Sequence, residues 1–438
     1  MNTHGKASIQ ISPYKPALHT PHTPLMPRAT TSLQTRCDRF AQVLLVGVFL
    51  TFPVALALGN VLGVLTLMAI LLSGNLRSQW RKVLQLPSTW AILLLFLLIL
   101  VGMSYTSAPA STAWVHLSKY AKLLVGLFFL SVLFDAKTRR NCLYAFMAAM
   151  GFILASGYTG IFVALPWSVT QQPGWGVDHT VVGDYITQNV MMTFFVLVCL
   201  AFVWKVKTPW VRGFWCLLAM LGAVSITHLS WGRTGFLLLV CSLVVAALAT
   251  VPGKKKMAAA VAVLALLALI GANSPLLMGK IRMGWQEIQN YEVNKQSSLG
   301  QRLYNYKTAL ELIQQNPLTG TGTGSFETQA CLLHPRPEDC KLLGWHPHNQ
   351  YLFFLIENGA LASLLFVALI ASLFYAARHR SAPDKFLMLG FATALAADSL
   401  VNSPLFSARE SHFFIFMMAL LVAGPVIEQH TEPPKTTP

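Results

Sequence analysis

Apolar runs long enough to cross, or nearly cross, a lipid bilayer recur along almost the whole chain, and they constrain the fold more than any other feature. The hydrocarbon layer is about 30 Å thick, so a spanning helix needs roughly 20 mostly apolar residues. Lipid offers no partner to backbone amides, so each run must be a helix that satisfies its own hydrogen bonds; a barrel needs alternating apolar and polar residues, which this sequence lacks. The sequence therefore predicts an all-α, multi-pass membrane protein.

Composition agrees, because 55% of the 438 residues are apolar and 11% are charged, against roughly a quarter charged in soluble domains. About twelve transmembrane helices are predicted. In chain order they cover Phe40–Leu58, Val61–Ser73, Trp90–Met103, Val115–Leu133, Leu143–Leu165, Tyr185–Val206, Val211–His228, Phe236–Val251, Met257–Ile270, Tyr351–Tyr375, Phe386–Val401 and Phe413–Ile427.

Lys and Arg residues gather between alternate spans, and cytoplasmic loops carry such an excess. This places both termini in the cytoplasm and one long helical loop domain on the outer side. The expected domains are a disordered tail at 1–38, nine helices at 39–272, the outer loop domain at 273–348, three helices at 349–428 and a tail at 429–438. The net charge of +16 follows from inner loops that face anionic lipid headgroups, so membrane lipids are expected partners and nucleic acid is not.

Two cysteines, Cys331 and Cys340, share the outer loop, whereas the other five lie within or beside apolar runs or on the inner side. An isolated pair in an oxidising compartment predicts a disulfide. Two free buried thiols are the alternative.

Cations at membrane depth are costly, so they are candidates for function. Arg233 lies at the outer end of the eighth span, where its guanidinium could bind a pyrophosphate. The alternative is that Arg233 only anchors the helix at the membrane interface. Arg302 lies on the apolar stripe of a helix, with Tyr306 and Ala309, and needs an anionic partner. That partner is either a substrate phosphate or a protein carboxylate such as Asp398.

His348 ends the loop and directly precedes the tenth span, so its imidazole is placed to act as a base. A histidine that, with Asn349, merely caps the helix is the alternative. His346 lies two residues away, but a His-x-His pair without a third ligand does not predict a metal site. Lys119 and Lys122, one turn apart, can face one anion or simply extend to the headgroups.

A glycine-rich stretch, Asn316–Phe326, resembles a dinucleotide loop only superficially, because it follows a helix and no strand precedes it. A compact turn that could present amides to an anion is expected instead. Glu357 is out of phase with His348 and is interpreted as a packing group.

Taken together, these motifs resemble the O-antigen ligase family of the O-antigen ligase/polymerase superfamily. The matching features are the helix from Arg302, the Asn316–Phe326 turn, and His348–Asn349 followed after nine residues by Gly359. The family pattern ends Gly-x-x-Gly, where this chain has Ala362, a small-for-small departure. Ser230–Gly235 also resembles the family's serine-arginine-threonine stretch.

The resemblance implies an enzyme of the bacterial inner membrane that works on the periplasmic face in lipopolysaccharide biosynthesis. Such an enzyme moves a polysaccharide from undecaprenyl pyrophosphate to a sugar hydroxyl of lipid A-core, without nucleotide, metal or other cofactor. His348, Arg233 and Arg302 are then expected to be catalytic, and Lys119, Lys122, His346 and Asn349 to bind substrate. Inversion at the anomeric carbon is expected, because the sequence offers no obvious carboxylate nucleophile.

Three alternatives stay open from the sequence. An O-antigen polymerase uses the same donor but a lipid-linked acceptor. A protein O-oligosaccharyltransferase is less favoured, because its relatives usually carry a further large soluble portion. A secondary transporter also typically has twelve helices, but this chain shows no convincing internal repeat.

Overall fold

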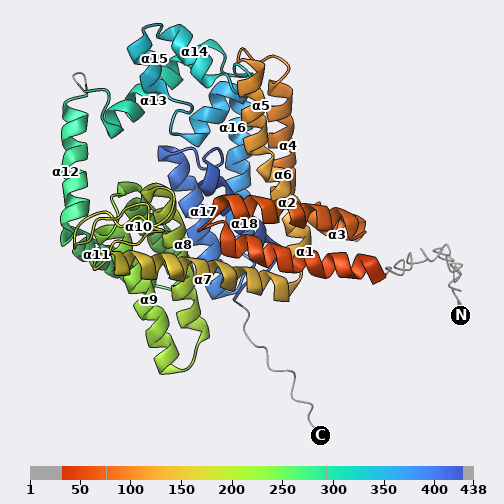
Figure 1. The fold of residues 1–438 in the computed structure, drawn as a ribbon, viewed down its shortest axis with the longest axis vertical. Coiled ribbons are helices and arrows are strands. Elements are labelled where there is room, and N and C mark those ends of the chain that lie inside the picture. Colours follow the sequence, from red (N-terminus) through yellow and green to blue (C-terminus); the bar gives the residue numbers. More distant parts are fainter. Residues whose placement is uncertain (1–31, 75, 292–293, 428–438) are drawn as a thin grey trace, which may run out of the picture.

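The computed structural model describes residues 32–74, 76–291 and 294–427, and over these ranges the chain forms helices and no strand (Figure 1). The predicted all-α class is confirmed for this part of the chain. In chain order the helices are α1 (Ser32–Thr51), α2 (Leu56–Leu72), α3 (Leu76–Val83), α4 (Pro87–Gly102), α5 (Ala110–Tyr120), α6 (Lys122–Leu133), α7 (Ala136–Gly160), α8 (Tyr185–Lys205), α9 (Pro209–His228), α10 (Arg233–Thr250), α11 (Lys255–Ala272), α12 (Pro275–Gln289), α13 (Ser298–Gln315), α14 (Phe326–Leu333), α15 (Pro337–Leu343), α16 (Gln350–Ala377), α17 (Ala382–Val401) and α18 (Ala408–Ala423).

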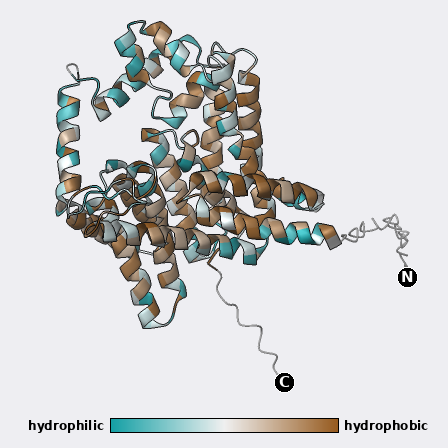
Figure 2. Ribbon diagram, in the orientation of Figure 1, coloured by the Kyte–Doolittle hydropathy of each residue, from teal (hydrophilic) through white to brown (hydrophobic). Residues whose placement is uncertain are grey.

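Seven helical stretches of the described chain are long and apolar enough to cross a membrane: α5 with α6, then α7 to α11, and α16. Helices α2 and α4 are apolar but shorter. Apolar residues dominate these helices, whereas polar residues concentrate on α12 to α15 (Figure 2). A multi-pass membrane protein is therefore confirmed. The remaining three predicted spans correspond to α1, α17 and α18, so the number twelve stays a prediction.

The start of the bundle differs from the prediction. A first span was predicted over 40–58, but α1 ends at Thr51 and α2 begins at Leu56, with a turn around Pro53. Helix α2 folds back so closely that Gly59 lies against the backbone of Phe52. Residues on both sides of the turn are apolar, so hydropathy alone could not locate it. Residues 32–38, expected in the N-terminal tail, are the first turns of α1; the rest of that tail and 429–438 lie outside the described residues.

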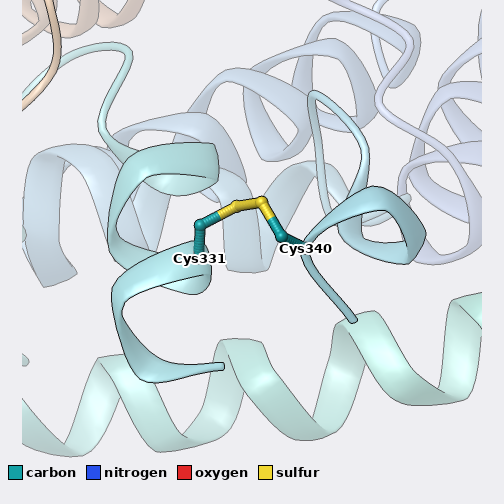
Figure 3. Close-up of a disulfide and its surroundings, with 2 residues drawn as sticks. All are labelled: Cys331 and Cys340. Atoms are coloured by element: carbon teal, nitrogen blue, oxygen red, sulfur yellow. A yellow bond between two sulfur atoms is a disulfide. The ribbon is translucent and has the colours of Figure 1, made fainter. Parts of the chain in front are cut away.

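Helices α12 to α15 form the segment predicted as a loop domain. Helix α12 stands at one edge of the molecule, and α13 to α15 cover the adjoining end (Figure 1). The predicted disulfide is present and joins Cys331 of α14 to Cys340 of α15 (Figure 3). Both short helices are held on α13, for example by the Gln301 amide, which donates to the Leu342 carbonyl at 2.6 Å. Helix α13 in turn contacts α16, which brings Arg302 near the start of α16.

The glycine-rich turn supports a break in α16. Gly359 has φ 78°, a left-handed value that interrupts the helix, and a Cβ there would collide with the Leu318 carbonyl. The carbonyls of Ile356 and Glu357 instead accept the N–H groups of Thr321 and Gly322, each at 2.8 Å. The expectation that this turn presents amides to an anion is thus wrong for these two amides. The Gly359 position of the family motif has a structural explanation.

Candidate functional site

His348 lies between α15 and α16 and adopts an unusual backbone conformation. Its φ of 55° is the only positive value of a non-glycine residue in the described chain, and such a conformation costs about 1–2 kcal/mol. The next residue, Asn349, caps α16, because its side-chain oxygen accepts the Leu352 N–H at 3.0 Å. The Asn349 amide also donates to the Leu400 carbonyl at 3.0 Å. Asn349 therefore ties the start of α16 to the end of α17.

Two neighbouring side chains hold the strained His348 backbone. The His348 N–H donates to Nδ1 of His346 at 3.2 Å. The Tyr306 hydroxyl, from α13, lies 3.1 Å from the His348 carbonyl and 2.7 Å from the Leu400 carbonyl, and its single proton serves these two acceptors. The conformation of His348 is thus fixed by residues of the loop, α13 and α17.

The His348 imidazole is set up to be neutral. Burial, and then the nearby Arg302 charge, lower its pKa from the ordinary 6.5 to about 4. Its Nδ1 atom is buried and has no hydrogen-bond partner among the described residues. At neutral pH the ring is therefore a free base with an unused polar atom.

His346 is neutral for the same reasons. Burial, followed by the charges of His348, Lys119, Arg302 and His116, lowers the His346 pKa to about 3. The two imidazole rings lie edge to face, with centroids 4.4 Å apart. Because Nδ1 of His346 accepts the His348 N–H, the neutral form is also the form that this hydrogen bond requires.

Arg302 is the cation of this group. In the described chain its guanidinium forms no hydrogen bond or ion pair, yet its charge acts on His348, His346, Asp398 and Glu410. Asp398, near the end of α17, is fully buried, and neither carboxylate oxygen has a hydrogen-bond partner in the described part. Unused polar atoms thus meet here from the loop, α13 and α17. Buried polar groups are usually satisfied in a native structure, so their convergence indicates a place where a polar substrate can bind.

Lys119 and Lys122, predicted to bind one anion, make different contacts in the structure. The Lys119 ammonium lies over the Phe406 ring, 3.6 Å from its centroid, and 5.3 Å from that of Trp345. Lys122 begins α6 and bonds to the Ser411 hydroxyl of α18. Ala121, whose backbone stays in the helical region, joins α5 to α6, and the Lys119 charge acts on Lys122. Lys119 therefore belongs to the His346 surroundings, and Lys122 to the bundle.

Arg233 is placed differently from Arg302. Its guanidinium donates to the Lys280 carbonyl at 3.0 Å and pairs with Glu287 at 3.5 Å, both on α12. Within the described ranges it forms no hydrogen bond or ion pair with His348 or Arg302, whereas the Arg302 charge acts on His348. The sequence could not show this, because the partner helix lies about fifty residues away.

Little in the sequence indicated that several residues lie near the site. Glu357 pairs with His116 at 3.3 Å, consistent with its interpretation as a packing group. Glu410, at the start of α18, is 1% exposed and had not been singled out. Its place in the first turn of an apolar helix was the signal available. No group of three or more His, Cys, Asp or Glu side chains within the described residues is arranged to hold a metal ion.

The fold and the site define a multi-pass helical membrane protein with a polar site where its loop segment meets the bundle. Residues 227–367 match the family model described as O-antigen ligase, a stretch that includes Arg233, Arg302, His348 and Gly359. This match confirms, over residues 227–367, the resemblance recognised from the sequence. The family implies a membrane enzyme of the glycosyltransferase kind that acts on lipid-linked glycans. No curated protein matches the chain.

Proposed function

We propose that this protein is an O-antigen ligase of the bacterial inner membrane, with both termini cytoplasmic and its site on the periplasmic face. It transfers glycan from undecaprenyl pyrophosphate to a sugar hydroxyl of lipid A-core, a step of lipopolysaccharide biosynthesis. One observation carries the proposal: His348 Nδ1, the Arg302 guanidinium and the Asp398 carboxylate gather without hydrogen-bond partners of their own among the described residues. A base beside an unpaired cation suits the attack of a hydroxyl with departure of an anion.

An apolar cavity next to this group supports a lipid-linked donor. The cavity has a volume of about 460 Å³ and lies between α10, α11, α16 and α17. It is lined by Val240, Cys241, Val244, Val245, Leu264, Tyr351, Thr393, Ala396, Ala397 and Leu400. Leu400 also supplies the carbonyl held by Tyr306 and Asn349. A polyprenyl chain in this cavity would therefore bring its pyrophosphate toward Arg302.

The chemistry follows from this arrangement. The acceptor hydroxyl oxygen bonds to the anomeric carbon of the donor glycan, and the bond from that carbon to the pyrophosphate breaks. The pyrophosphate leaves with the electron pair, while His348 Nδ1 takes the hydroxyl proton. Arg302 balances the charge on the leaving group. This single displacement inverts the anomeric carbon and uses no nucleotide or metal.

Other residues act through these groups. His346 and Tyr306 are positioning residues that hold the His348 backbone, and the Asp398 carboxylate interacts with the Arg302 charge without a hydrogen bond to any described residue. Arg233 exchanges Glu287 for a phosphate oxygen when the donor binds, because this ion pair is partly exposed and a phosphate offers more acceptor atoms. Lys119 adds positive charge beside His346.

The test is glycan transfer by purified protein in proteoliposomes, with lipid-linked glycan as donor and lipid A-core as acceptor. His348→Ala is expected to insert and fold normally, by its size-exclusion profile and unfolding temperature, yet to lose transfer by about 10³-fold. Near-normal transfer by folded His348→Ala would remove this residue from the mechanism.

The choice of acceptor separates the ligase from the polymerase, since the two share a donor. Offered lipid A-core and a second lipid-linked repeat in equal amounts, the wild-type protein is expected to glycosylate the core. Extension of the lipid-linked repeat, with the core untouched, would identify a polymerase.

A further inference from the structure

A second cavity, of about 390 Å³, lies where the starts of α8 and α18 meet the end of α17. Its volume is within the usual range for small-molecule sites. Unlike the apolar cavity, it carries several polar side chains. Its polar lining consists of Asp184, Thr187, Asn402, Ser407, Arg409 and Glu410.

Hydrogen bonds hold several polar side chains of this cavity in place. The Asn402 amide donates to both carboxylate oxygens of the buried Glu410, at 2.9 and 2.8 Å. Asp184 caps α8 by accepting the N–H and the hydroxyl of Thr187, at 2.9 and 2.8 Å. Both carboxylates of the cavity are therefore held by hydrogen bonds, the buried Glu410 by Asn402 and the exposed Asp184 by Thr187.

Arg409 completes the lining with an unused donor. Its side chain packs on Gly183, where a Cβ would collide with the guanidinium. It is attracted to the Asp184 charge, but its Nε atom is buried and has no hydrogen-bond partner within the described chain. A ligand that accepts a hydrogen bond would satisfy this atom.

The cavity lies beside the proposed reaction centre. Arg302 acts electrostatically on Glu410 as well as on His348. Asn402, which lines the cavity, is two residues beyond Leu400, which lines the apolar cavity and supplies the carbonyl held by Tyr306. The end of α17 thus contributes to both the polar and the apolar cavity, and Tyr306 joins it to the His348 carbonyl.

We propose that the polar cavity binds a neutral sugar ring of the acceptor and presents its hydroxyl toward His348. Carboxylates accept hydrogen bonds from sugar hydroxyls, while the guanidinium and amide groups donate to them. The Asp184 charge offsets the Arg409 guanidinium, so the donor pyrophosphate is assigned to the unpaired Arg302 instead. This inference rests on the proposed glycosyl transfer and assigns its acceptor subsite.

The test compares substitutions in this cavity with a matched substitution elsewhere. Asp184→Asn keeps an N-cap side chain, and Glu410→Gln keeps the size of the side chain. Glu338→Gln is the control. It makes the same kind of change in a different cavity, of about 500 Å³, next to α15. With purified lipid A-core as the varied substrate, both test variants are expected to raise the acceptor KM about tenfold. The donor KM should stay within about twofold, and Glu338→Gln should change neither.

A second kind of substitution leaves both carboxylates unchanged, so it tests the cavity even if Asp184→Asn or Glu410→Gln fails to fold. Ala408 is exposed and lines the polar cavity, so Ala408→Trp fills it. Leu342→Trp is the matching change in the cavity next to α15. Ala408→Trp is expected to raise the acceptor KM, and Leu342→Trp is not.

An unchanged acceptor KM in the folded test variants, or a rise in the donor KM alone, would overturn the acceptor subsite. So would a rise of the acceptor KM in the variants next to α15 instead. If the wild-type protein itself forms no conjugate, the proposed function fails and not merely this assignment.

Discussion

Helix α10 contributes Arg233 to its contact with α12, and α13 carries Arg302 near His348, yet the two arginines differ. Arg233 is paired with Glu287 and donates to a carbonyl of α12. Arg302 forms no hydrogen bond or ion pair with another described residue, although His348 and Asp398 lie within reach of its charge. A satisfied cation can hold two helices together, whereas an unsatisfied one beside other unused polar atoms indicates a place for substrate. The comparison therefore assigns the chemistry to the α13–α16 contact.

Removing Arg302 should have the largest effect on this comparison. Arg302→Ala is expected to lower kcat for glycan transfer by about 10²–10³-fold, because a preorganised donor to the leaving group is lost. Steady-state transfer in proteoliposomes measures it. Arg282→Ala removes an exposed cation of α12 and serves as a control that should stay near the wild-type rate. Equal losses in both variants would mean that general positive charge, rather than this site, matters.

Substituting Arg233 and Glu287 one at a time tests whether their ion pair is only structural or whether Arg233 also binds substrate. If Arg233 exchanges Glu287 for the donor phosphate, Arg233→Ala lowers kcat/KM by roughly 10- to 100-fold, whereas Glu287→Gln stays within about threefold of wild type, as expected for a partly exposed ion pair. The same transfer assay measures both. Matching losses in the two variants would instead make the ion pair a purely structural link to α12.

His346 offers a smaller and more specific effect. In His346→Asn the side-chain oxygen can replace Nδ1 as acceptor of the His348 N–H, but in His346→Gln it lies farther from the backbone. The Gln variant is expected to lose roughly five- to tenfold in kcat, the value of one hydrogen bond, and the Asn variant to recover most of it. Equal activity of the two variants would contradict a positioning role for Nδ1.

The pH dependence gives the smallest effect. A base must be neutral, and the lowered pKa of His348 means that the neutral form persists until the pH falls to about 4. The kcat/KM of the wild-type protein should therefore be flat from pH 8 to about 5 and fall near pH 4. Arg302→Gln removes a charge that lowers this pKa, so its weaker activity should begin to fall at a higher pH. An unshifted profile, in samples that recover fully at pH 7, would separate Arg302 from His348.

The sequence predicted those features that depend on nearby residues. Apolar runs predicted the helical membrane fold, and two isolated cysteines predicted the Cys331–Cys340 disulfide. Capping of α16 by Asn349 was only the alternative to its predicted role in substrate binding, and the local signal for it is a polar residue directly before an apolar helix. The position of His348 at the boundary between the loop and the helix was predicted from the same change from polar to apolar residues.

Features that depend on contacts between distant segments could not be predicted. The turn around Pro53 lies within a uniformly apolar stretch, so hydropathy joined its two sides into one span. Two amides of the glycine-rich turn donate hydrogen bonds to carbonyls of α16 just before its break at Gly359. No local sequence pattern predicted the left-handed conformation of Gly359. Arg233 likewise found its partner on a helix that periodicity could not place beside it.

A structure of the protein with undecaprenyl-pyrophosphate-linked glycan bound tests the central claim most directly. The account predicts that the pyrophosphate oxygens lie within hydrogen-bond distance of the Arg302 guanidinium, with the anomeric carbon facing His348 and the lipid chain in the apolar cavity. A donor bound elsewhere, with Arg302 and His348 both remote from the pyrophosphate, would contradict it.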